Sequence, residues 1–388
     1  MAHERYQSRV SATPGTVRDD VVPAFGTLAL ALFFHGLDSA RQVTGQWFDL
    51  AGLGPVQTPS TTVLEGPGWR LRRYGTSGRQ GPLLLIVPAP IKRHYIWDLM
   101  PSCSVVRRAA ADGCLVYLLE WTQAPSDLGL DAYIQAIDRC AGWIAQRTAR
   151  RPHLLGHSLG GTLAALHVAR HASHSASLVM VESPLSFGRS AGALAPLLAV
   201  GPKGAAIQAA FSNVPGTILG LGAALASPKE FLWERYADAV ATAMAGSALM
   251  KKHLLAIRWT LDELPMPGKL LAQLIDQLYL DDRLMRRKLI VQGRRVAPLD
   301  VSVPIAAVVD PRSRILPSAS MIDFLRAAPR REQLLLHYAG DVGVALQHVG
   351  VLIGDTAHRE IWPRILRWLR QLDTGSSNPE DRPLPASK

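Results

Sequence analysis

Six short apolar runs recur along the chain, separated by stretches with helical spacing. Because these runs are almost continuously apolar, they fit strands that are buried on both faces of a parallel sheet. Alternation of such strands with helices predicts an α/β fold with right-handed crossovers. The predicted strands lie at residues 82–90, 114–120, 152–158, 176–183, 304–310 and 332–340.

The alternation stops between residues 185 and 301, where helical spacing and turns continue without a core strand. An insertion of about 115 residues is far longer than the usual connection of 2–6 residues. We expect it to form a helical cap over the carboxyl edge of the sheet, where open α/β sheets bind ligands. The predicted organisation is an N-terminal arm and helical segment (1–60), a first part of the core (61–184), the cap (185–301), a second part of the core (302–373) and a disordered tail (374–388).

The most apolar early segment, residues 25–37, is too short to cross a bilayer, which needs about 20 residues. It fits either a buried helix or an amphipathic segment that lies on a lipid or polymer surface. We expect the first, with Phe33 and Phe34 packed in the core. The polar first 20 residues lack the apolar segment of a secretory signal, so we expect a cytoplasmic protein.

A hydrophobic content of 48% with 19% charged residues is typical of a globular protein. The net charge of +11 suits either solubility or attraction of an anionic partner such as acyl-CoA or a charged surface. The basic residues are scattered and no nucleic-acid motif accompanies them, so nucleic acid is not an expected partner. Three cysteines without metal-ligand spacing or an even count indicate a reducing compartment, and we expect neither a metal nor a cofactor. The sequence leaves the oligomeric state open, a homodimer included.

Residues 156–160, Gly-His-Ser-Leu-Gly, match the G-x-S-x-G pattern between a predicted strand and a predicted helix. This is the setting of a nucleophile elbow in the α/β-hydrolase fold, where a strained turn exposes the serine. The alternative is that Ser158 only caps the helix. We predict that Ser158 is a nucleophile, which requires a base, an acid and two oxyanion donors elsewhere in the chain.

In this fold the acid and then the histidine follow the serine along the chain. Of the late histidines, His337 lies in a strand and His358 at a helix start, so we predict His348 as the base. Asp310, at the end of a predicted strand, is the expected acid, and Asp341 is its rival.

An acyl-transfer site also needs two hydrogen-bond donors for the oxyanion. We expect one to be the backbone N–H of Leu159, directly after the nucleophile. The other should come from the loop after the first core strand, and we expect it to be the backbone N–H of Ile91.

Several segments resemble polyhydroxyalkanoate synthases, in the same order along residues 80 to 370. The stretch from "VPAPIKRHYIWDLMP" to "LVYLLEW" resembles the family's second oxyanion segment, and "LDAYIQAIDRC" resembles the helix before its elbow. "RWTLDELPMPGKLLAQLIDQLYLDDRLM" is similar to the end of the family's cap, and "QHVGVLIG" to the loop that carries its base. The resemblance implies an acyl-enzyme mechanism on hydroxyalkanoate esters, with acyl-CoA as a candidate donor and a polymer granule as a candidate surface.

Two positions depart from that family. The synthases use cysteine in a G-x-C-x-G box, whereas this chain has Ser158 in a lipase-like box. The family's acid lies four residues before a proline, where this chain has Ser313, and Asp310 stands three residues earlier.

Serine in place of the synthases' cysteine favours ester hydrolysis over polymerisation. The preferred hypothesis is therefore a serine hydrolase of hydroxyalkanoate polymers, oligomers or related acyl esters. A synthase that uses serine and a non-catalytic granule-binding protein are the alternatives.

Overall fold

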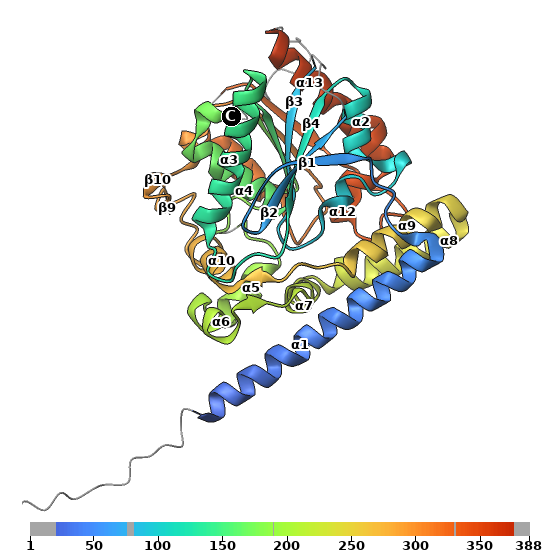
Figure 1. The fold of residues 1–388 in the computed structure, drawn as a ribbon, viewed down its shortest axis with the longest axis vertical. Helices are drawn as coiled ribbons and strands as arrows, with labels where there is room; N and C mark the ends of the chain where they lie inside the picture. The colour runs from blue at the N-terminus through green and yellow to red at the C-terminus, as the bar shows by residue number, and fades with distance from the viewer. Residues whose placement is uncertain (1–20, 76–80, 189, 330, 376–388) are drawn as a thin grey trace, which may run out of the picture.

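The computed structural model describes residues 21–75, 81–188, 190–329 and 331–375; the predicted arm and most of the predicted tail lie outside these ranges. An eight-stranded sheet forms the centre of the molecule, in the order β1-β2-β4-β3-β5-β6-β11-β12 (Figure 1). Its strands are β1 (Ser60–Gly66), β2 (Trp69–Tyr74), β3 (Leu83–Val87), β4 (Leu115–Trp121), β5 (His153–His157), β6 (Ser177–Val181), β11 (Ile305–Val309) and β12 (Gln333–His337).

All neighbours from β4 to β12 pair in parallel, which confirms the predicted α/β class with its mostly parallel sheet. The six predicted strands correspond to β3, β4, β5, β6, β11 and β12. The sequence prediction did not include β1 and β2, which form an antiparallel extension at the β4 edge.

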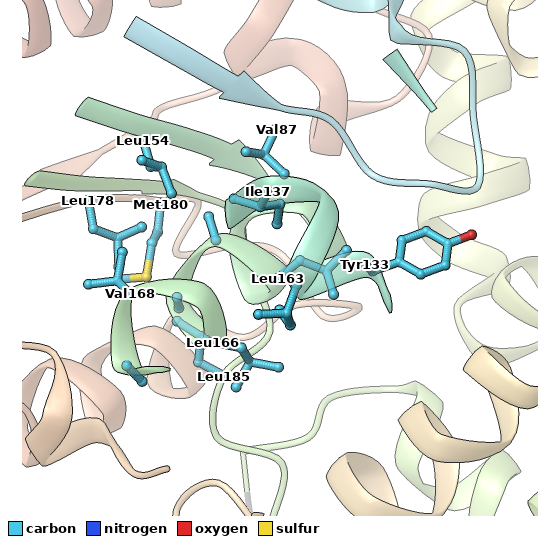
Figure 2. Close-up of a cluster of buried hydrophobic side chains, with 14 of the residues drawn as sticks. Val87, Tyr133, Ile137, Leu154, Leu163, Leu166, Val168, Leu178, Met180 and Leu185 are labelled. Carbon is cyan, nitrogen blue, oxygen red and sulfur yellow. The ribbon is translucent and has the colours of Figure 1, made fainter. Parts of the chain in front are cut away.

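Helices cover both faces of this sheet, and alternate side chains of each central strand enter one of two apolar layers. In β3, Leu83, Leu85 and Val87 face the layer of α3 and α4, whereas Leu84 and Ile86 face the other. Figure 2 shows part of the first layer, where Leu163 and Leu166 of α4 lie near Ile137 of α3 beneath the strands. The core helices are α2 (Val105–Ala111), α3 (Leu130–Thr148), α4 (Leu159–Arg170), α11 (Ser318–Ala327), α12 (Gln347–Ile353) and α13 (Trp362–Thr374).

Between β6 and β11, no described residue joins the main sheet, and helices predominate. Two small two-stranded ladders, β7 with β8 and β9 with β10, lie within this region. Its elements are α5 (Leu194–Val200), α6 (Gly204–Ala210), β7 (Asn213–Val214), α7 (Gly216–Ala226), α8 (Glu234–Ala245), α9 (Ser247–Thr260), β8 (Met266–Pro267), α10 (Gly268–Gln273), β9 (Leu289–Val291) and β10 (Arg294–Val296).

The N-terminal helix α1 (Val21–Phe48) runs beside helices of residues 185–301, the segment called the cap from here on, and not under the sheet (Figure 1). The expectation that Phe33 packs in the core is therefore wrong, since this side chain is 60% exposed, and Phe34 is half-buried against it. Polar contacts fix the helix instead: the Asp38 carboxylate accepts hydrogen bonds from the backbone N–H groups of Gly216 and Thr217 at the start of α7. Among the described residues, none of the helices combines the length and apolar character that a membrane crossing requires.

Two buried histidines make the folded state sensitive to acid. Burial lowers the pKa of His94 and of His358 to about 4 each, below the ordinary value of 6.5. Below pH 6.5 these histidines become protonated in the unfolded chain but stay neutral in the folded chain. The free energy of unfolding therefore falls as the pH falls towards 4. We expect each histidine to lower the unfolding free energy by roughly 3 kcal/mol over that interval.

The measurement is the urea midpoint at pH 7.5 and at pH 5, with a lower midpoint expected at pH 5. His358→Gln should reduce the difference between the two midpoints. Equal midpoints for the unsubstituted protein would contradict the prediction.

Candidate active site

Ser158 stands in a strained turn between β5 and α4. Its backbone has φ 55° and ψ −134°, in the region that side-chain-bearing residues rarely adopt. The turn is held from both sides, because the N–H of Ser158 donates to the carbonyl of Val181 at 2.9 Å and its own carbonyl accepts from Gly161 at 2.9 Å. Strain that the surrounding structure maintains is typical of functional sites. The geometry is that of the predicted elbow.

The flanking glycines are required by close backbone contacts. A Cβ on Gly160 would lie 2.1 Å from the carbonyl oxygen of Val87, at the end of β3. A Cβ on Gly156 would lie 2.4 Å from the Cα of Gly161. Both distances are far below a possible carbon contact, so glycine at 160 allows the elbow to approach β3, and glycine at 156 allows the end of β5 to pack against the start of α4.

His348 is brought against the elbow by the residue next to the serine. Its ring lies 4.4 Å from the ring of His157, and its carbonyl oxygen is 2.8 Å from His157 Nε2. Burial lowers the pKa of His157 well below 6.5, so its ring stays neutral and donates Nε2–H to that carbonyl. His348 is the second residue of α12, a short helix where we expected a loop.

The carboxylate next to His348 belongs to Glu182, a residue that the sequence analysis did not select. Glu182 follows β6 with a φ of 44° and is 2% exposed. Its Oε2 lies 3.8 Å from His348 Nδ1, and neither of these two buried atoms has a hydrogen-bond partner within the part of the chain that the structure describes. Its Oε1 accepts the backbone N–H of Asp310. Burial raises the pKa of Glu182, against the opposing effect of His348.

Asp310 follows β11 as expected, but its carboxylate is occupied by Arg312. Arg312 Nε donates to Asp310 Oδ1 at 2.9 Å, and its Nη2 donates to Oδ2 at 2.7 Å. The backbone N–H of Arg312 donates to Oδ1 as well. Among the described residues, Asp310 forms no ion pair with His348.

Asp341, the alternative candidate for the acid, holds neighbouring segments in place through hydrogen bonds to its carboxylate. One of its oxygens accepts the N–H of Thr356 at 2.9 Å, and the other accepts the hydroxyl of Tyr338 at 2.9 Å. The segment that carries Asp341 is also tied to Gln347 by two hydrogen bonds. These contacts fix both ends of α12 and thereby support His348 indirectly.

The two expected oxyanion donors lie at the start of α4 and in the loop after β3. Leu159 is the first residue of α4, where backbone N–H groups have no partner within the helix. Ile91 lies in the loop after β3, and its carbonyl accepts the N–H of Leu264 from the cap at 3.1 Å. The neighbouring Lys92 extends this attachment, since its Nζ donates to Glu263 at 2.6 Å. The cap therefore fixes the loop that contains Ile91.

A pocket of about 330 Å³ opens between the cap and His348. Glu234 and Phe231 line it from the cap, and Asp310 and Arg312 line it from the end of β11. Ser158 is not among its lining residues, so the pocket reaches the histidine side of the site.

The cap also holds the backbone before His348. Asp238 of α8 is buried, and its carboxylate accepts the N–H groups of Gly343 at 2.7 Å and Ala345 at 2.8 Å. His253 of α9 contacts the same carboxylate at 2.8 Å. Burial alone would raise the pKa of Asp238, but these hydrogen bonds outweigh it and the pKa is lowered. An ionised cap residue thus positions the loop that leads into α12.

Sequence comparisons identify relatives over most of the chain. The poly(3-hydroxyalkanoate) polymerase subunit PhaC of Haloarcula marismortui is 25% identical over 338 residues, which cover 82% of this chain and 69% of that protein. The subunit of the same name from Haloferax mediterranei is 26% identical over 336 residues, covering 84% of this chain and 66% of that protein. The chain thus spans about two thirds of the length of these relatives. No protein-family model matches it.

A solved structure from Sulfolobus solfataricus, assigned as a lipase, shares the fold with a TM-score of 0.50 and 16% identity. The match covers 80% of this chain and 93% of that protein. With the parallel sheet, it confirms the predicted α/β-hydrolase fold. The PhaC relatives confirm the resemblance to polyhydroxyalkanoate synthases.

Proposed function

We propose that this homologue of the PhaC polymerase subunits, with its α/β-hydrolase fold, is a serine-dependent ester hydrolase of hydroxyalkanoate polymers, oligomers or related acyl esters. The observation that carries the proposal is the strained turn at Ser158, with the ring of His348 4.4 Å from the ring of the adjacent residue, His157. Acyl transfer through an acyl-enzyme requires a serine in such an elbow with a histidine within its reach, and His348 is the histidine that the fold brings to this turn.

In the proposed reaction, Ser158 Oγ attacks the ester carbonyl while His348 Nε2 accepts the hydroxyl proton. The N–H groups of Leu159 and Ile91 stabilise the negative charge on the carbonyl oxygen. His348 then gives its proton to the leaving alkoxide, which departs as an alcohol. A water molecule attacks the acyl-enzyme with His348 again as base, and the free acid leaves with Ser158 restored.

We assign the orienting carboxylate to Glu182. The unpartnered Glu182 Oε2 and His348 Nδ1 face each other at 3.8 Å, so a movement of less than 1 Å would complete the hydrogen bond. That bond would hold the proton on Nδ1 and leave Nε2 free for the serine. The Asp310 carboxylate, paired to Arg312, is less available for this role.

The names of the relatives favour a second candidate function, polymer synthesis from a hydroxyacyl-CoA with Ser158 in place of cysteine. Both reactions pass through an acyl-enzyme and differ in whether water or a chain-end hydroxyl attacks it. We prefer hydrolysis because the elbow carries serine. In either reaction, the protein would act in the cytoplasm at or near polymer granules.

The test supplies a 3-hydroxyacyl-CoA and a short hydroxyalkanoate ester in separate assays and measures polymer and free acid. We expect free acid from the ester and little polymer from the thioester. Polymer from the thioester, with no acid from the ester, would instead establish the synthase function.

A fluorophosphonate probe distinguishes both enzymes from a non-catalytic granule protein. We expect covalent labelling of Ser158 and no labelling of Ser158→Ala. Lack of labelling, together with lack of turnover in both assays, would overturn the catalytic proposal.

A further inference from the structure

Three histidines and an aspartate meet at the opposite end of α4 from Ser158. His167 lies on α4, His171 caps its end, and His174 lies in the next short turn. Their spacing of four and then three residues places neighbouring imidazoles on one side of the chain. Asp138 reaches the same point from α3. At a rise of 1.5 Å per residue, α4 separates Ser158 from His167 by about 14 Å and from His171 by about 20 Å, so the cluster takes no part in ester chemistry.

The side chains converge on a single carboxylate oxygen. Asp138 Oδ1 lies 2.6 Å from His174 Nδ1 and 3.2 Å from His167 Nε2. His171 Nδ1 lies 4.0 Å from the same oxygen. One ligand atom from each of Asp138, His171 and His174 falls within 4.8 Å of the others. Donors on a zinc ion are roughly 3.3 Å apart, as follows from Zn–N distances near 2.0–2.1 Å, so small side-chain movements would close the site.

The orientation of His171 indicates a ligand. Its Nε2 contacts Gln292 Oε1 at 2.8 Å, while the amide nitrogen of Gln292 is directed to the carbonyl of Asp131. An amide oxygen only accepts, so His171 Nε2 donates a hydrogen bond to Gln292. This contact directs the other ring nitrogen, Nδ1, towards the Asp138 oxygen. A hydrogen bond from the distal nitrogen is the usual support of a metal-bound histidine.

We propose that Asp138, His171 and His174 bind one divalent transition-metal ion, with His167 available as a fourth ligand and zinc as the first candidate. Imidazole nitrogens with one carboxylate suit zinc, nickel or copper and do not suit magnesium or calcium, which prefer oxygen ligands. Access is open, because the His174 side chain is 44% exposed, whereas His167 is fully buried beneath the cluster. The expectation of no metal rested on cysteine spacing, and the sequence signal for the proposed site is H-x3-H-x2-H in residues 167–174.

Such an ion would have a structural role. It would join the middle of α3 to the end of α4 and to the segment that enters β6. His174 would bind through Nδ1, the ring nitrogen that lies 2.6 Å from Asp138 Oδ1, and no redox step is involved. Binding only to the folded chain would raise the unfolding temperature.

The test uses the full-length protein, stripped with a chelator and dialysed, and titrates it with Zn²⁺ by calorimetry. We expect one equivalent to bind with a Kd in the micromolar range or below. Saturating Zn²⁺ should raise the unfolding temperature by about 3–6 °C, and Mg²⁺ should not change it. Co²⁺ should give the visible absorption of a four-coordinate site.

Two variants give the comparison. His174→Ala removes an exposed ligand and should weaken Zn²⁺ binding at least tenfold, whereas His337→Ala, which removes an exposed histidine outside the cluster, should not change it. Because the measurement is binding, its outcome is independent of any ester-hydrolase activity. Absence of stoichiometric binding, or equal Kd values for the unsubstituted protein and His174→Ala, would overturn the proposal.

Discussion

Ser158→Ala is expected to reduce ester turnover by a factor of about 10³–10⁶, the range found when the nucleophile of a catalytic triad is removed. Alanine retains the Cβ and the strained backbone, and among the described residues the Ser158 side chain makes no hydrogen bond that the fold would lose. The thermal unfolding midpoint should therefore stay within about 1–2 °C of that of the unsubstituted protein.

The readout is kcat for a short hydroxyalkanoate ester, with circular dichroism to confirm the fold. Ser102→Ala, at an exposed serine, serves as the matched control and should retain full activity. A folded Ser158→Ala protein with more than a tenth of the original activity would remove Ser158 from the proposed mechanism.

Glu182→Gln is expected to lower kcat by about 10³–10⁴ while leaving KM within a factor of about three, as for other triads that lose their carboxylate. Glutamine has the same shape and can still accept the backbone N–H of Asp310 through its amide oxygen. It cannot hold a negative charge opposite His348 Nδ1. A loss confined to kcat would separate positioning of the histidine from a general structural effect.

The comparison variants are Asp310→Asn and Asp341→Asn. Asp310 pairs with Arg312 and Asp341 anchors backbone, so we expect each substitution to reduce kcat no more than about tenfold. A loss of about 10⁴ for Asp310→Asn, with a small effect of Glu182→Gln, would return the acid to the position that the sequence favoured. Small effects of all three substitutions would indicate a serine–histidine dyad.

The parallel core of the fold was predictable because each buried strand carries its own apolar run. β2 was not, since its residues 69–74 contain Arg70, Arg72 and Arg73 and read as a polar segment. Arg72 is tolerated there because its guanidinium donates to Glu120 on the adjacent strand β4 at 2.6 Å. The two residues are far apart in the chain, so no local pattern shows that the charge is compensated.

In the candidate site, too, the features set by local sequence were predictable, and those set by contacts between distant residues were not. The elbow at Ser158 is a local motif, and the chain order of the fold pointed to His348. Glu182, the acid that we propose, was not selected because the same rule places the acid after a later strand, although a glutamate at the end of the apolar run 176–183 was a visible signal. Its proposed role depends on how β6, β11 and α12 meet, which sequence spacing does not report. α1 was misjudged because its long apolar run resembles core, whereas the residues that fix it to the cap are polar, such as Asp38.

The contacts of Asp238 also predict what happens when residues 185–301 are exchanged between this protein and a relative. A chimaera that exchanged residues 185–301 for the cap of a relative would retain the serine and the histidine of the recipient. Unless the donor cap placed a carboxylate where Asp238 meets Gly343 and Ala345, the loop before His348 would lose both of its anchoring acceptors. Under the proposed function, the cap residues that line the pocket and the carboxylate that anchors the loop before the proposed base would be exchanged together, so a cap could be exchanged only with a matching loop.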